Sequence, residues 1–169
     1  MYGFAGGDPV NFDDPFGLWP FGTHNKIIDA ALPNAGFIDR TLIKLGSVLF
    51  DVSTQGQTQS YLHGMSEAGQ NPLAQQAGTA EFVEGATGAA TVFQATGRHV
   101  LAMMTIGAAI HPVMDATSPS HSDANGKPQV WNPADLSAHR KGEKGSPTPE
   151  QQKKMGERIR AIYDQVAKP

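Results

Sequence analysis

Helical spacing of apolar residues, without any useful run of β alternation, is the feature that most limits what this chain can fold into. Apolar residues recur every three to four positions in residues 37–52 and again from about Thr79 to about Ala116. Residues 149–167 have the same spacing opposite a polar face, which is typical of an amphipathic closing helix. Such spacing places apolar side chains on one face of a helix. The sequence therefore predicts an all-α fold and a compact helical domain.

Glycine and proline indicate where these helices break. The segment HNKIIDAAL (24–32) predicts a helix that stops at Pro33. The stretch 79–116 contains four glycines, which weaken a helix and predict two or more pieces. Pro112 lacks a backbone donor, so a kink or a new helix start is expected there. The four glycines are Gly85, Gly88, Gly97 and Gly107.

The beginning of the chain differs from the rest. Residues 1–18, MYGFAGGDPVNFDDPFGL, are rich in Gly, Pro and Asp and have no helical period, which predicts a short irregular segment. The total of 169 residues suffices for one domain with a packed core. We therefore divide the chain into a boundary segment, 1–18, and a single domain, 19–169.

Composition limits the chemistry that the domain can perform. The chain has no cysteine, so any metal must be held by histidines, carboxylates and main chain. A net charge of -3 provides no broad basic surface, and no stable nucleic-acid partner is expected. No segment has the roughly 18 consecutive apolar residues of a membrane span. The start of the chain lacks a secretory signal, so export would use information outside this sequence.

Two histidine–carboxylate pairs at i, i+4 spacing are the strongest chemical signal. His111 pairs with Asp115, and His139 pairs with Glu143. On a helix this spacing places both side chains on one face, as two ligands of a metal require. One such pair is more often a surface pair, but here His121 follows six residues after Asp115 and an apolar segment leads into His111. Together these features predict a metal site.

Nine candidate ligands follow one another in the chain: Trp19, His24, Asp51, His63, His111, Asp115, His121, His139 and Glu143. Their order resembles the superfamily of zinc-dependent phospholipases C and single-strand nucleases. That resemblance implies an all-helical enzyme with up to three zinc ions. The resemblance places Asp51 among the metal ligands, with Asp39 as a rival for that position, and it leaves His99 as a surface residue.

The same resemblance divides these ligands among three ions. The first zinc would be held by Asp51, His63 and His111, and the second by His121, His139 and Glu143. The third would be held by Trp19, His24 and Asp115, with Asp115 bridging. Asp51 would also orient the attacking water as a base.

The boundary segment carries a second resemblance. Pro9 to Leu18 is similar to the PxxxxDPxGL motif at the end of the Rhs core, where self-cleavage releases a C-terminal toxin. This implies a cut after Leu18, with Asp13 and Asp14 performing the acid–base chemistry. Trp19 would then become the N-terminus, and its free α-amine could bind zinc at neutral pH. The cut would thus also complete the third zinc site.

The two resemblances imply a secreted antibacterial effector toxin with phospholipase C activity. Its partners would be a phospholipid membrane surface as substrate, a cognate immunity protein and the Rhs shell of the parent effector. Delivery into a target cell is expected, with the periplasm or inner-membrane surface favoured over the cytoplasm. The alternatives are a single-strand nuclease or 3′-nucleotidase, favoured by the short interval from Trp19 to His24, and a non-enzymatic metal-binding module.

Overall fold

The computed structural model describes residues 21–123, 125–131 and 148–167, and these ranges confirm the all-α class. Between the helices the described chain forms only isolated β-bridges and no sheet. Among the described residues, no helix combines the length and hydropathy of a membrane span. The helices are α1 (Phe21–Ala31), α2 (Phe37–Ser53), the 3-10 helix η2 (Gln57–His63), α3 (Pro72–Ala95), α4 (His99–Asp115) and α6 (Pro149–Ala167).

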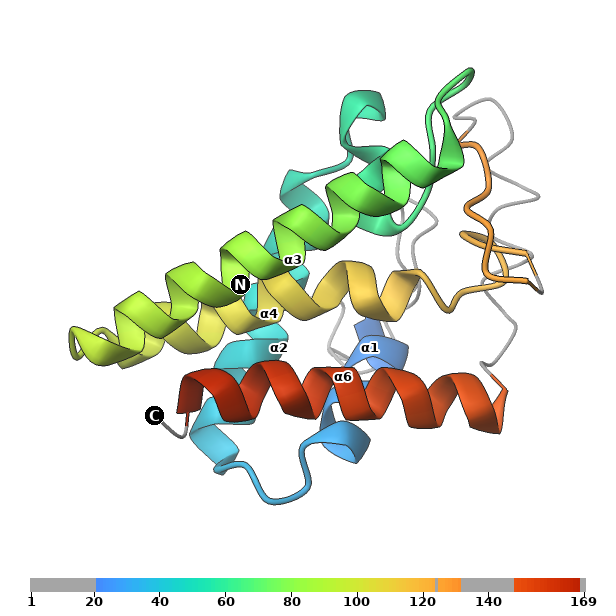
Figure 1. The fold of residues 1–169 in the computed structure, drawn as a ribbon. Coiled ribbons are helices and arrows are strands. Elements are labelled where there is room, and N and C mark those ends of the chain that lie inside the picture. The colour runs from blue at the N-terminus through green and yellow to red at the C-terminus, as the bar shows by residue number, and fades with distance from the viewer. Residues whose placement is uncertain (1–20, 124, 132–147, 168–169) are drawn as a thin grey trace, which may run out of the picture.

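Helix α4 is the centre of the fold. It packs against α1, α2, η2, α3 and α6, and Figure 1 shows it running between α3 and α6. Its second half is buried on nearly every side, from Ile106 to Asp115. A helix can be buried this way only if most of its side chains are apolar, which the segment MMTIGAAI provides.

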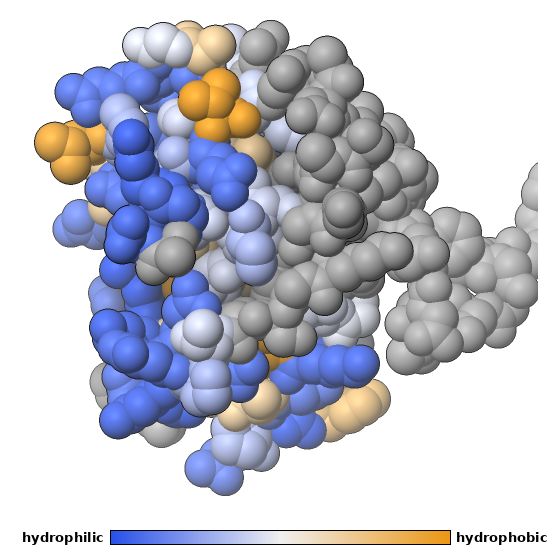
Figure 2. All heavy atoms as spheres, turned by 90° about the vertical axis from the view of Figure 1, so that its right-hand side faces the viewer, coloured by the Kyte–Doolittle hydropathy of each residue, from blue (hydrophilic) through white to orange (hydrophobic). Residues whose placement is uncertain are grey.

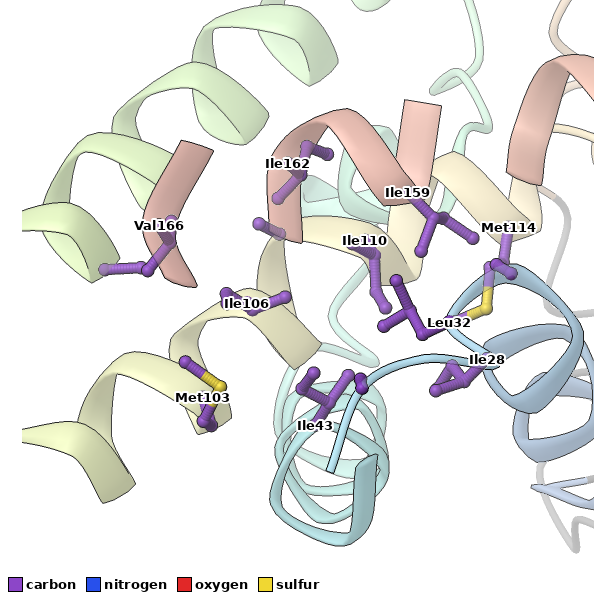
Figure 3. Close-up of a cluster of buried hydrophobic side chains, with 14 of the residues drawn as sticks. Ile28, Leu32, Ile43, Met103, Ile106, Ile110, Met114, Ile159, Ile162 and Val166 are labelled. Atoms are coloured by element: carbon purple, nitrogen blue, oxygen red, sulfur yellow. The ribbon is translucent and has the colours of Figure 1, made fainter. Parts of the chain in front are cut away.

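The hydrophobic core lies where α1, α2 and α6 meet α4. Figure 3 shows isoleucine, methionine and valine side chains from these four helices converging on one another and on Leu32, which directly follows α1. Burial of these side chains provides most of the driving force for folding. The labelled core residues are Ile28, Leu32, Ile43, Met103, Ile106, Ile110, Met114, Ile159, Ile162 and Val166.

Three helix boundaries differ from the sequence prediction. The stretch 79–116 does form two helices, separated at Gly97 with a φ of 74°. However, α3 begins seven residues earlier than predicted, at Pro72, because the Asn71 side chain accepts a hydrogen bond from Leu73 N and caps it. The sequence predicts a kink or a new helix start at Pro112, and the new start is wrong, since α4 continues through this proline. Helix α1 also begins earlier, at Phe21.

Gly46 of α2 and Gly107 of α4 allow these two helices to touch through their backbones. A Cβ atom added to Gly46 would lie 2.1 Å from Met104 O, and one added to Gly107 would lie 2.2 Å from Ile43 O. Both neighbours are main-chain atoms that cannot rotate away. Gly107 therefore permits a close helix contact, and the predicted division of this stretch falls at Gly97.

We expect Gly46→Ala and Gly107→Ala to destabilise the fold, because the added methyl forces α2 and α4 apart. Overpacking of this kind typically costs about 1–3 kcal/mol. The matched control is Gly88→Ala in α3, where an added Cβ meets nothing within 4 Å. That substitution should stabilise the helix by about 0.5–1 kcal/mol. Urea unfolding measures all three, and equal stabilities would contradict the tight-contact interpretation.

Candidate metal centre

Six of the nine candidate ligands lie together in one buried cluster, which we call the metal centre. They come from four helices and one loop, although up to 97 positions separate them in the sequence. Trp19, His139 and Glu143 lie outside the described residues, as do the cleavage-motif residues Asp13, Asp14 and Leu18. The six residues of the metal centre are His24, Asp51, His63, His111, Asp115 and His121.

Helices α2 and α4 carry the centre of this cluster. Asp51 lies four residues after Ser47 on α2, and Asp115 lies four residues after His111 on α4. These positions are the continuation of the Gly46–Gly107 contact along the two helices. The close approach of the two backbones therefore brings Asp51 Oδ1 to within 3.4 Å of His111 Nε2.

The first donor group matches the set predicted for the first zinc. Asp51 Oδ1, His63 Nδ1 and His111 Nε2 form a triangle with sides of 3.3, 3.4 and 3.7 Å. Ligand atoms around a tetrahedral zinc are about 3.3 Å apart, because the bonds are about 2.0–2.1 Å long. The triangle therefore has the size of one face of a zinc coordination shell.

Asp115 connects this triangle to His24. Its Oδ2 atom lies 2.9 Å from His63 Nδ1 and 3.0 Å from His111 Nε2. Its other oxygen, Oδ1, lies 2.9 Å from His24 Nε2. His24, His111 and Asp115 form a second group whose donor atoms lie within 4.8 Å of one another. A carboxylate with one oxygen toward each group has the geometry expected of a bridging ligand.

His121 reaches the cluster from the loop after α4. Its Nδ1 donates to the His63 carbonyl at 2.6 Å and lies 3.7 Å from Asp115 Oδ2. The loop is fixed by backbone bonds, from Gln129 N to His121 O and from Ser66 N to Gln129 O. His121 is thus beside the cluster and linked to the chain around His63.

Two polar residues that the sequence prediction missed orient the histidine rings. The Thr54 hydroxyl donates to Phe50 O, so His63 Nε2 must donate to Thr54, at 3.0 Å to its hydroxyl and 3.1 Å to its carbonyl. Ser47 Oγ lies 3.1 Å from His111 Nδ1. Metal-binding histidines are usually held by such a bond from the second ring nitrogen. The i, i+4 spacing of Ser47 and Asp51 was the signal available in the sequence.

The fixed tautomer of His63 makes a positive charge necessary between its Nδ1 atom and the neighbouring carboxylates. With its proton on Nε2, neutral His63 directs the Nδ1 lone pair toward the Asp51 and Asp115 carboxylates. Asp51 Oδ2 is buried and has no hydrogen-bond partner among the described residues. Buried negative charge and lone pairs facing one another are costly without a compensating charge. Either a proton or a metal ion can supply that charge.

The ionisation of His111 reflects the same requirement. Burial lowers its pKa, but the Asp115 and Asp51 carboxylates outweigh burial and raise the pKa from 6.5 to about 10. Burial raises the pKa of Asp115, but His111 and His121 outweigh it and hold that pKa well below its usual value. Without metal, the cluster is therefore stabilised by a proton on His111.

The donor set fits a transition-metal ion. All donors are imidazole nitrogens and carboxylate oxygens, a combination that suits zinc and its divalent neighbours. Either group, His24–His111–Asp115 or Asp51–His63–His111, could hold an ion, and His111 Nε2 can serve one ion at a time. The identity of the metal as zinc stays a prediction.

Asp39 and His99 form a separate network at the other end of α4. His99 Nε2 lies 2.8 Å from Asp39 Oδ1, and the Tyr163 hydroxyl donates to Asp39 Oδ2 at 2.8 Å. Asp39 therefore does not replace Asp51 in the cluster. His99 is half-exposed, as expected of a residue outside the ligand set.

In comparisons with protein families, with curated proteins and with solved structures, nothing matches this chain.

We expect zinc to stabilise the folded protein, and His111→Ala or Asp115→Ala to remove this effect. Binding to the folded state alone adds about 2.7 kcal/mol at a zinc concentration of 100 times Kd. His99→Ala is the control, because it removes a histidine of the same helix from outside the cluster. Thermal unfolding with zinc and with chelator measures the effect. An equal response of all three variants would show that the cluster is not the metal site.

Metal-free protein should lose stability as pH rises from about 6.5 toward 10. The folded-state pKa of His111 is raised from 6.5 to about 10, so its stabilising proton is fully present below 6.5 and is lost through that range. The stability advantage of wild type over His111→Gln should shrink across the same window in chelator. A constant difference between the two unfolding temperatures would contradict the proton-stabilised cluster.

Proposed function

We propose that this chain is a zinc-dependent phosphodiester hydrolase, specifically a phospholipase C that acts as an antibacterial secreted effector toxin. The observation that carries the proposal is the geometry of Asp115, whose Oδ1 faces His24 and whose Oδ2 faces His63 and His111. Such a carboxylate suits two metal ions held close together. Adjacent ions are the usual arrangement for phosphate ester hydrolysis.

Zinc, when bound, would make water more acidic and neutralise charge on the phosphate oxygens. Asp51 is the residue best placed to accept the proton of the attacking water, because its Oδ2 is not engaged by the described residues. Water would add to phosphorus while the bond to the glycerol oxygen breaks. The leaving oxygen then takes up a proton, which yields diacylglycerol and a phosphorylated head group.

An exposed apolar stripe on α2 favours a lipid substrate over a nucleic acid. These side chains are 46–67% exposed and lie seven, four and three positions apart, which puts them on one side of the helix. The opposite side of α2 carries Ser47 and Asp51. Exposed apolar side chains on one side of a helix can insert into a membrane surface. The stripe consists of Ile38, Leu45, Leu49 and Val52.

The biological setting of the proposal comes from the sequence alone. A cut after Leu18 would separate the domain from the Rhs shell and make Trp19 its N-terminus, two residues before α1 begins. His24, on α1, already contacts Asp115. The free amine of Trp19 would then lie close in the sequence to α1, the helix that carries His24. A cognate immunity protein would protect the producing cell, and the target would be the periplasmic or inner-membrane surface.

We expect zinc-loaded protein beginning at Trp19 to hydrolyse phosphatidylcholine or phosphatidylethanolamine vesicles, and to do so faster than the intact chain. Asp51→Asn should lower the rate roughly 10²- to 10⁴-fold, as loss of a general base does. Asp39→Asn is the matched control, because it makes the same change on the same helix outside the metal centre.

The assay measures diacylglycerol and the released head group, with single-stranded DNA and RNA as parallel substrates. Cleavage of nucleic acid alone would replace the phospholipase proposal with the nuclease alternative. Zinc binding without hydrolysis of any substrate would leave a metal-binding module. Equal rates from the intact and cut chains would show that the terminal amine is irrelevant.

A further inference from the structure

A groove of about 380 Å³ lies on the other side of α4 from the metal centre. Figure 1 shows α3 and α6 flanking α4, and residues of all three helices line the groove together with the loop after α4. This volume is within the range of small-molecule sites, about 300–1,000 Å³. The groove is thus large enough for a ligand and is distinct from the metal ligands themselves.

Most of the groove surface is apolar. Its walls include Ala80 and Val83 of α3, Val113 of α4 and Met155 of α6. Figure 2 shows the end of the molecule where α6 begins. The described residues on this face are mostly hydrophilic, with only isolated apolar ones. The apolar lining of the groove is therefore not part of a larger hydrophobic patch on this face of the molecule. Such a lining suits the hydrocarbon part of a ligand.

Gln75, one of the residues that line the groove, has a buried acceptor. Its side chain is 1% exposed, and its Oε1 has no hydrogen-bond partner among the described residues. The orientation of the amide is fixed, because the Thr79 hydroxyl donates to Tyr61 O and so must accept from Gln75 Nε2. An unsatisfied buried acceptor costs about 1–3 kcal/mol. A ligand with a hydroxyl donor would remove that cost.

Two cations at one rim give the groove a charge preference. Lys154 and Arg158 are four residues apart on α6, and no described residue that lines the groove is acidic. Lys154 contacts Glu150 at 2.8 Å, but both side chains are about three-quarters exposed. Such surface pairs are weak and can exchange partners. The rim therefore favours an anionic group although the whole chain is negative.

The groove also shares its wall with the metal centre. Gly64, Pro112, Ala116 and Ser122 line the groove, and each directly follows one of the candidate ligands in the sequence. At Gly64 the approach is tight, since an added Cβ would lie 2.9 Å from Ala116 Cα. The backbone that positions the ligands is therefore the same backbone that a groove occupant would touch.

We infer that this groove binds a single-chain amphiphile with a phosphate head and a hydroxyl group, the chemistry of a lysophospholipid. The chain lies against α3 and α4, the phosphate is held by Lys154 and Arg158, and the hydroxyl donates to Gln75 Oε1. This binding does not depend on hydrolysis at the metal centre.

The test is calorimetric titration with a short-chain lysophosphatidic acid kept below its micelle-forming concentration. Lys154→Ala/Arg158→Ala should weaken binding at least about tenfold, which corresponds to about 1.4 kcal/mol. The control, Lys153→Ala/Arg160→Ala, removes the same charges from the same helix at a different hollow, between α1 and α6. Ala80→Trp should block the groove from an exposed position and abolish binding, with an unchanged circular dichroism spectrum.

Glycerol phosphate and an uncharged alcohol of the same chain length separate the contributions of head and chain. Both should bind at least about tenfold more weakly than the complete probe. Equal binding of either would overturn the assignment, as would equal weakening by the two double variants or a complete absence of binding. In chelator, where no metal is bound, Asp51→Asn should keep full affinity for the probe. A failure of the hydrolysis proposal would therefore leave this result unchanged.

Discussion

The buried carboxylate of Asp115 is the group on which the arrangement of the domain depends. It is fully buried, yet His24, His63 and His111 approach its two oxygens to about 3 Å. A carboxylate in this position would destabilise the fold without that compensation. The interior is therefore stable only when α1, α4 and the 3-10 helix η2 are placed so that these contacts form. The fold and the site depend on each other for this reason.

Helix α4 meets two demands at once through its periodicity. Ile106, Ile110 and Met114 point into the hydrophobic core (Figure 3). One position along from each of them, Gly107, His111 and Asp115 form a second row. Gly107 and His111 face α2, and Asp115 faces His24 of α1 and His63 of η2. Because the two rows are adjacent, the core holds the ligand row in place. Gly107 is the position in that row where any side chain would separate the two helices.

The sequence predicted residue types and their order better than it predicted geometry. The i, i+4 spacing of His111 and Asp115 depends only on helix geometry, so it could be recognised in the sequence. The choice of Asp51 over Asp39 required the resemblance, because both lie on α2 and only the packing of α2 on α4 separates them. The roles of Thr54 and Gly107 depend on contacts between segments distant in the sequence, and no local pattern indicates such contacts.

The shared wall between the metal centre and the groove has a thermodynamic consequence. A ligand in the groove touches Pro112 and Ala116, and the preceding residues, His111 and Asp115, are part of the metal centre. If occupancy shifts that backbone, it changes the affinity for metal, and metal must change the affinity for the occupant by the same factor. A helix buried on both sides transmits small shifts because the packed interior has few voids to absorb them. The placement of both sites on α4 therefore provides a physical route by which a lipid-like ligand could regulate metal binding.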